Sequence, residues 1–263
     1  MMITLLSPAK TLDFENPSPT NLCTKPDFLD FSNDLIKSLS KLSSVEIESL
    51  MGLSPKLAQL NHDRFQAWTK AHRAETSKQA VVAFKGDVYE GLQAWNFNPL
   101  DFEFAQSNLR ILSGLYGILK PLDLIQPYRL EMGTVYANPA GKDLYAFWGN
   151  RLAKSITEDL KITKSQTIIN LASQEYSKAA QLKKIDANIF SPSFKDEKNG
   201  KFKIISFYAK RARGLMANFI ITNKIESEND IKEFSMDGYS YSPKDSSANE
   251  PVFLRSEKAR IAA

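Results

Sequence analysis

Short apolar runs separated by stretches of helical spacing are the feature that most constrains how this 263-residue chain folds. Such runs occur at residues 3–6, 81–84, 110–112, 167–171 and 202–207. Their length and β-branched content are typical of buried strands, and helices between strands are typical of crossover connections. We therefore predict an α/β fold of the mixed α+β kind, with a central sheet flanked by helices, as a single domain over residues 1–263.

Two further signals predict a mixed sheet rather than a purely parallel one. Residues 188–190 and 252–254 are expected to add antiparallel strands, and Asn199 and Gly200 form a strong hairpin-turn signal.

The segment before residue 80 looks helical, apart from a surface loop predicted at residues 15–27. Ser54 is the expected N-cap of one helix, with Pro55 at its first position. That helix carries an apolar stripe, which we interpret as core: Leu57, Leu60, Phe65 and Trp68.

The side-chain inventory excludes several classes of protein. With one cysteine, Cys23, and two histidines, His62 and His72, the chain cannot form an internal disulfide or a closed zinc or iron–sulfur site. An all-carboxylate metal site stays open. We predict no cofactor and no structural metal.

We also predict no membrane span, because no apolar run reaches roughly 18 residues. Residues 1–10 lack the basic start of a signal peptide, so we expect the cytoplasm.

Polar and small residues follow each predicted strand, where ligands bind in open α/β sheets. If the strands are parallel, these ends converge on one crevice. The side chains that we select there are Lys10, Lys85, Asp87, Gly114, Tyr116, Gly117, Lys210, Arg211 and Arg213.

Two other segments add candidates. Arg129 and Glu131 would share one face of an extended segment, as a ligand-positioning pair or as a packing ion pair. Residues 195–213, which include Lys201 and Lys203, have a net charge of +5, more than the +4 of the whole chain. Such a local positive patch suits phosphate binding, and its alternative is a solvated hairpin and helix face. Strict phosphate-loop, dinucleotide and nucleophile-elbow motifs are absent.

These motifs resemble the YaaA-type peroxide-stress resistance family. The resemblance runs in order through residues 6–13 (LSPAKTLD), 83–89 (AFKGDVY), 112–117 (LSGLYG), 126–133 (QPYRLEMG), 141–145 (GKDLY), 170–173 (NLAS) and 196–216. It implies a cytoplasmic bacterial protein that helps the cell survive hydrogen peroxide and is associated with lower unincorporated iron. It also implies DNA binding through a positively charged cleft and a helix-hairpin-helix-like element. No settled catalytic reaction comes with the family.

The best local candidate for that element is residues 112–117. Its glycines, Gly114 and Gly117, are one residue further apart than the usual Gly-x-Gly. This interpretation competes with the strand predicted at residues 110–112, and the sequence leaves both open.

Three functions remain. The first is DNA binding, in which Lys10, Lys85, Arg129, the glycine hairpin and the basic stretch hold phosphates while Tyr116 or Tyr208 stacks on a base. The second is an enzyme acting on nucleic acid or a phosphorylated small molecule, with Lys10 and Lys85 on phosphate and Asp87 or Glu131 as general acid or base. Iron sequestration by carboxylates is a distant third. The sequence does not determine the oligomeric state.

Overall fold

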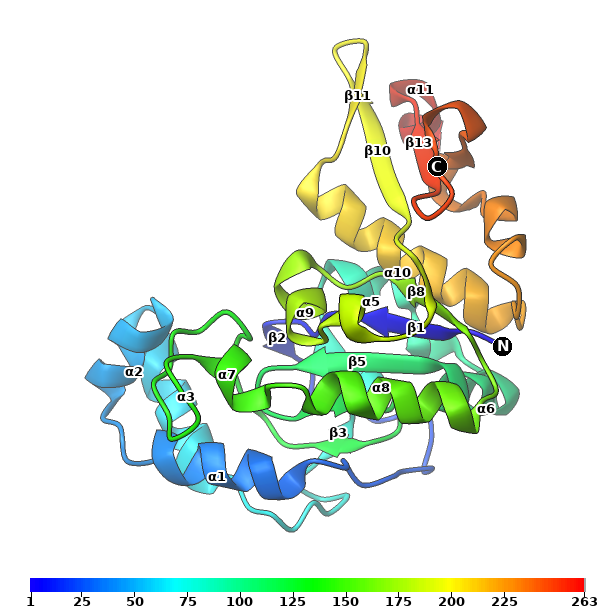
Figure 1. Ribbon diagram of the computed structural model, residues 1–263. Coiled ribbons are helices and arrows are strands. Elements are labelled where there is room, and N and C mark those ends of the chain that lie inside the picture. The colour runs from blue at the N-terminus through cyan, green and yellow to red at the C-terminus, as the bar shows by residue number, and fades with distance from the viewer. Residues whose placement is uncertain (263) are drawn as a thin grey trace.

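The computed structural model describes residues 1–262 and contains a main sheet, a second sheet and a long helix between them (Figure 1). The main sheet has the strand order β6–β5–β1–β8–β9. Its strands are β1 (Ile3–Leu6), β5 (Leu109–Ser113), β6 (Gly117–Leu119), β8 (Thr167–Asn170) and β9 (Asn188–Phe190). β1 is parallel to both β5 and β8, and only β6 runs antiparallel within this sheet. The prediction of a mixed central sheet is confirmed.

The second sheet has the order β11–β10–β13–β12. It consists of β10 (Ser193–Lys198), β11 (Lys201–Lys203), β12 (Ser240–Tyr241) and β13 (Val252–Arg255). Asn199 and Gly200, both at positive φ, form the predicted turn between β10 and β11. Two short antiparallel ladders pair β2 (Thr11–Leu12) with β4 (Phe84–Lys85), and β3 (Lys78–Gln79) with β7 (Leu124–Ile125).

Helices surround both sheets. They are α1 (Leu29–Leu39), α2 (Ser44–Met51), α3 (Pro55–Ala67), α4 (Ala80–Ala83), α5 (Asp87–Leu92), α6 (Pro99–Asn108), α7 (Leu144–Trp148), α8 (Arg151–Ile162), α9 (Gln174–Ala179), α10 (Ser206–Thr222) and α11 (Glu257–Ala262). Ser54 caps α3 and Pro55 is its first residue, as predicted. None of the helices in the described part of the chain is long and apolar enough to span a bilayer.

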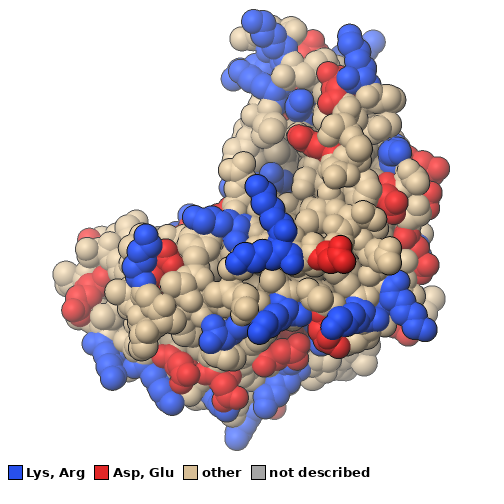
Figure 2. Space-filling view, in the orientation of Figure 1, with Lys and Arg blue, Asp and Glu red and all other residues tan. Residues whose placement is uncertain are grey.

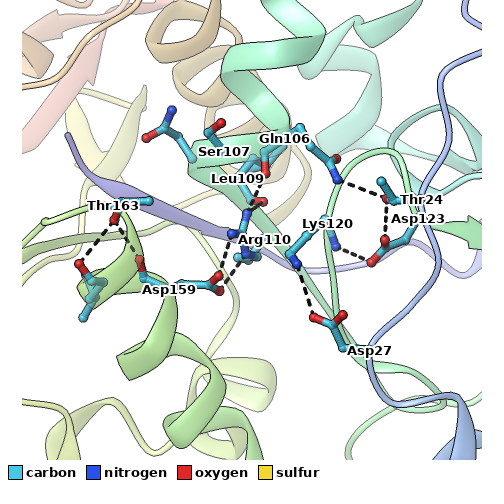
Figure 3. Close-up of polar contacts among 12 residues, drawn as sticks. Thr24, Asp27, Gln106, Ser107, Leu109, Arg110, Lys120, Asp123, Asp159 and Thr163 are labelled. Atoms are coloured by element: carbon cyan, nitrogen blue, oxygen red, sulfur yellow. Dashed lines mark hydrogen bonds and ion pairs between the residues drawn. The ribbon is translucent and has the colours of Figure 1, made fainter.

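A buried ion pair attaches α8 to the main sheet (Figure 3). The Arg110 guanidinium donates to both carboxylate oxygens of Asp159, each at 2.7 Å, and its third nitrogen donates to the carbonyl of Leu109. Because every charged oxygen and most donors are satisfied, this charge is tolerated inside a strand that is buried along its whole length.

Two of the predicted strands are wrong. Residues 81–84 form the buried helical turn α4 followed by the two-residue strand β4, because a short apolar run does not distinguish a strand from a helix buried on all sides. Residues 202–207 span two elements, the end of β11 and the start of α10, and belong to the second sheet. Phe202 in β11 is 44% exposed, so this run was not a core strand.

Other predictions are corrected in detail. Residues 188–190 form a strand, but it is parallel to β8, and residues 252–254 lie in β13, which is parallel to β10 and antiparallel to β12. The α3 stripe is only partly core, because Phe65 and Trp68 are buried whereas Leu57 and Leu60 are exposed.

The sequence left two predictions open for residues 110–117, a strand end or a helix-hairpin-helix element, and the pairing of β5 with β6 shows which is correct. These residues form a strand, a turn and the start of the antiparallel strand β6, with Ser113 opposite Gly117. The segment is therefore a β-hairpin and not a helix-hairpin-helix element.

A close crossing of α5 and α10 joins the main sheet to the second one. A Cβ atom on Gly214 would lie 1.7 Å from the carbonyl oxygen of Val88, and one on Gly91 would lie 2.2 Å from that of Arg211. The two backbones are therefore in direct contact, which only glycine allows at these positions.

We predict that Gly214→Ala lowers the free energy of unfolding by about 2–3 kcal/mol, because the new methyl group forces the two backbones apart. Urea denaturation measures this effect. The matched control is Gly133→Ala, whose new Cβ would meet only the Glu175 side chain at 3.3 Å. Equal free energies of unfolding for Gly214→Ala and Gly133→Ala would contradict the close backbone contact between α5 and α10.

Candidate functional site

A cleft of about 480 Å³ opens beyond the carboxyl ends of β1 and β8. Its walls come from segments far apart in the chain, at residues 7–11, 85–88, 128–131 and 171–176, and from α10. Seven of the residues selected from the sequence line it: Lys10, Lys85, Asp87, Arg129, Glu131, Lys210 and Arg213. Residues from the first, second, fourth and fifth predicted strand ends thus line one cleft, whereas none from the third end, residues 113–117, lines it.

Hydrogen bonds between the ends of β1 and β8 form the floor of the cleft. The backbone N–H of Ser173 donates to Ser7 Oγ at 2.9 Å, and the Ser7 hydroxyl lies 3.3 Å from that of Ser173. The Tyr89 hydroxyl of α5 donates to the Ser7 carbonyl at 3.1 Å. The floor therefore holds both strand ends and α5 in one arrangement.

Glu131 forms two ion pairs inside the cleft. Its carboxylate accepts from Lys10 Nζ at 2.7 Å and from the Arg129 guanidinium at 3.0 Å. Arg129 is mostly buried, whereas the Lys10 side chain is 62% exposed. The pairing of Arg129 with Glu131 that alternation suggested is present, and the carboxylate orients both cations.

Lys85 is held by Asp13, which sequence reasoning did not select. The Asp13 carboxylate lies 4.0 Å from Lys85 Nζ and 3.8 Å from the Nζ of the buried Lys78. Hydrogen bonds from Asn16, followed by the charge of Lys78, lower the pKa of Asp13 to about 2. Asp13 is therefore ionised at neutral pH.

α10 supplies another wall of the cleft. Lys210 and Arg213 are one turn apart and face the same side of this helix. Burial lowers the pKa of Arg213, but a guanidinium stays charged at neutral pH. The α10 wall is thus positive, and it adjoins Asp87 at the start of α5.

Other predicted site residues lie outside the cleft. Arg211 points toward Asp237, 3.6 Å away, and toward the Glu90 carbonyl. Lys201 and Lys203 are exposed on the β10–β11 hairpin. Gly114, Tyr116 and Gly117 belong to the β5–β6 turn, and Tyr116 is fully buried, so its ring is not available to stack on a base.

Sequence reasoning missed Tyr128, Tyr176 and Glu175, which also line the cleft. Glu175 accepts from the backbone N–H of Gly133 at 2.8 Å and so connects α9 to the segment that carries Glu131. The signal was present, because Glu175 and Tyr176 directly follow the fourth predicted strand.

The sequence model of the family described as peroxide stress protein YaaA matches residues 2–245. The chain belongs to this family. It is also 51% identical over 257 residues to a UPF0246 protein of Shewanella amazonensis, an alignment that covers 98% of this chain and all of that protein. Family membership supports a role in the response to peroxide. Within residues 1–262, no group of three or more His, Cys, Asp or Glu side chains could hold a metal ion.

A histidine behind the cleft makes stability depend on pH. Burial lowers the pKa of His72 to about 4, from 6.5. As the pH falls, the unfolded chain binds this proton first. The contribution of neutral His72 to the free energy of unfolding is therefore fully present above about pH 6.5, and it is lost as the pH falls from there to about 4.

We predict that His72→Gln reduces the loss of stability between about pH 7 and pH 4.5, as measured by urea denaturation at each pH. His62→Gln is the control and should retain that loss. An NMR titration in which the His72 ring protonates near pH 6.5 would contradict the prediction.

Proposed function

We propose that this protein contributes to peroxide resistance by binding DNA through its backbone phosphates in the cleft. The observation that carries the proposal is the convergence of five cations from separate segments on one cleft: Lys10, Lys85, Arg129, Lys210 and Arg213. Asp87, Glu131 and Glu175 also line it, so the balance is positive. Phosphate contacts of this kind provide most of the affinity of sequence-independent DNA binding.

The shape of the molecule supports a long polyanion better than a small ligand. Figure 2 shows Lys and Arg side chains gathered at the inner corner of an L-shaped molecule, and a second group at the top. Figure 1 places the β10–β11 hairpin there, which carries Lys195, Lys198, Lys201 and Lys203. A duplex that lies in the corner would extend from the cleft toward the hairpin.

The cleft also has donors suited to phosphate oxygens. Within residues 1–262, Arg129 Nε is buried and has no hydrogen-bond partner. This unpaired donor costs free energy, and a shift of the Arg129 side chain on anion binding would give it an acceptor. The resemblance to the family adds two further parts to the proposal. One is a lower level of unincorporated intracellular iron, and the other is a location in the cytoplasm.

We predict that Lys210→Ala combined with Arg213→Ala weakens DNA binding and makes the salt dependence shallower. Loss of two phosphate contacts should reduce the slope of log K against log salt by about 2. Fluorescence anisotropy of a labelled duplex measures both quantities. The control is Lys183→Ala combined with Lys184→Ala, two exposed lysines that do not line the cleft.

The proposal fails if the parent protein does not bind at low salt, or if the cleft and control variants bind equally. A loss confined to Lys201→Ala combined with Lys203→Ala would assign binding to the hairpin instead of the cleft.

A second candidate function is catalysis on nucleic acid or a phosphorylated small molecule. It is favoured by the carboxylates of Asp87 and Glu131 in the same cleft as Lys10 and Lys85. A carboxylate beside a phosphate-binding cation is the arrangement that general acid–base catalysis needs.

If this function is correct, we predict turnover of duplex DNA with an abasic site, reduced by about 10²-fold or more in Asp87→Asn. Gel analysis of the cleaved strand gives the rate, and DNA affinity should not fall in that variant, because Asp87→Asn removes a negative charge from the cleft. Absence of turnover in the parent protein, or equal turnover in Asp87→Asn, would leave a binding protein.

A further inference from the structure

A buried tyrosine behind the cleft has an unusual set of hydrogen-bond partners. Tyr116 is fully buried in the β5–β6 turn. Its hydroxyl lies 2.9 Å from Trp68 Nε1, 3.0 Å from the backbone nitrogen of Gln126 and 2.9 Å from His72 Nε2.

These partners determine where the phenolic proton points. A hydroxyl has one proton and two acceptor lone pairs. The Trp68 and Gln126 groups can only donate, so they occupy both lone pairs, and the Tyr116 proton must point at His72 Nε2. The other ring nitrogen, Nδ1, then carries the imidazole proton and faces the Lys70 carbonyl at 3.3 Å; the Gln126 Nε2 amide, which donates to the Thr69 carbonyl, also lies 3.3 Å from Nδ1. His72 is therefore a neutral base positioned to take the phenolic proton.

Aromatic side chains connect this pair to the cleft. The Tyr128 ring lines the cleft, and its centroid is 5.2 Å from that of Tyr116. The Trp68 ring lies 6.5 Å beyond, on the other side of Tyr116. Tyrosine and tryptophan are the aromatic side chains that lose an electron most readily, and centroid distances this short allow transfer between neighbours.

We propose that Tyr116 is a one-electron redox site, which Tyr128 connects to the cleft. A one-electron oxidant there, such as an oxidised base or a radical derived from peroxide, takes an electron from Tyr116 through Tyr128. The Tyr116 O–H bond breaks, its proton passes to His72 Nε2, and a neutral tyrosyl radical and an imidazolium remain. A thiolate reductant in the cleft then returns one electron through Tyr128 and is left as a thiyl radical, while His72 returns the proton to the Tyr116 oxygen. The site would remove oxidising equivalents from whatever the cleft holds, so it does not depend on the ligand being DNA.

The pair explains why a histidine occupies this position. An oxidised phenol is a much stronger acid than an imidazolium, so it loses its proton to His72 even though burial disfavours the charged ring; without a base, oxidation would have to form the higher-energy phenol radical cation. Tyr136 offers the natural comparison, because it is also buried but its hydroxyl donates to Ser38 Oγ at 2.6 Å, where no base is present.

The test is photo-oxidation of the full chain by ruthenium tris-bipyridine with persulfate, followed by freezing and electron paramagnetic resonance. We expect a tyrosyl radical whose signal is mostly lost in Tyr116→Phe and is kept in the control Tyr136→Phe. His72→Gln retains an acceptor for the hydroxyl but cannot take up the proton, so the radical yield should fall several-fold. Circular dichroism and thermal unfolding establish that each variant is folded.

Fluorotyrosine placed at position 116 alone keeps the proposal falsifiable if a variant fails to fold. Its fluorine should add a hyperfine splitting to the signal. A spectrum without that splitting, or an unchanged yield in folded His72→Gln, would overturn the proposal.

Discussion

The backbone contact between α5 and α10 at Gly91 and Gly214 is the constraint on which the rest of the site depends. α5 starts at Asp87, two residues after Lys85, and Tyr89 binds it to Ser7 just after β1, so its position is set by the main sheet. α10 continues from the β10–β11 hairpin and so belongs to the second sheet. Their close approach brings Lys210 and Arg213 to the same cleft as Lys85. With larger residues at the crossing, the two walls would separate and the cations would no longer share a ligand.

Two carboxylates, those of Glu131 and Asp13, pair with three of the cations that line the cleft. Glu131 orients Lys10 and Arg129, and Asp13 holds Lys85. These carboxylates offset part of the repulsion among the cations and reduce the number of side-chain conformations lost on binding. In the proposed binding mode, an incoming phosphate would replace the contacts that Lys10 and Arg129 make with Glu131 and would also contact Lys210 and Arg213. Such a cleft favours an anion with several charges over a single carboxylate.

Much of the central sheet could be predicted from the sequence, because β1, β5 and β8 are buried apolar runs of strand length. Residues 81–84 have the same composition but form a helical turn, since burial on all sides removes the periodicity that separates the two structures. The run at 202–207 failed for another reason, because it crosses an element boundary at Ile205. In spite of this error, four of the five segments predicted to form the crevice line the cleft. Lys210 and Arg213 reach it through a helix crossing that no local pattern reveals. The same applies to Tyr116 and His72, whose partners lie up to 54 residues away in the chain.

The central claim is that residues from both walls of the cleft bind one ligand together. Lysine acetylation mapped by mass spectrometry, with and without duplex DNA at low salt, tests this most directly. The account predicts that DNA protects Lys10, Lys85 and Lys210 together, while Lys183 and Lys184 react as before. Protection spread evenly over the surface, or confined to one wall of the cleft, would contradict it.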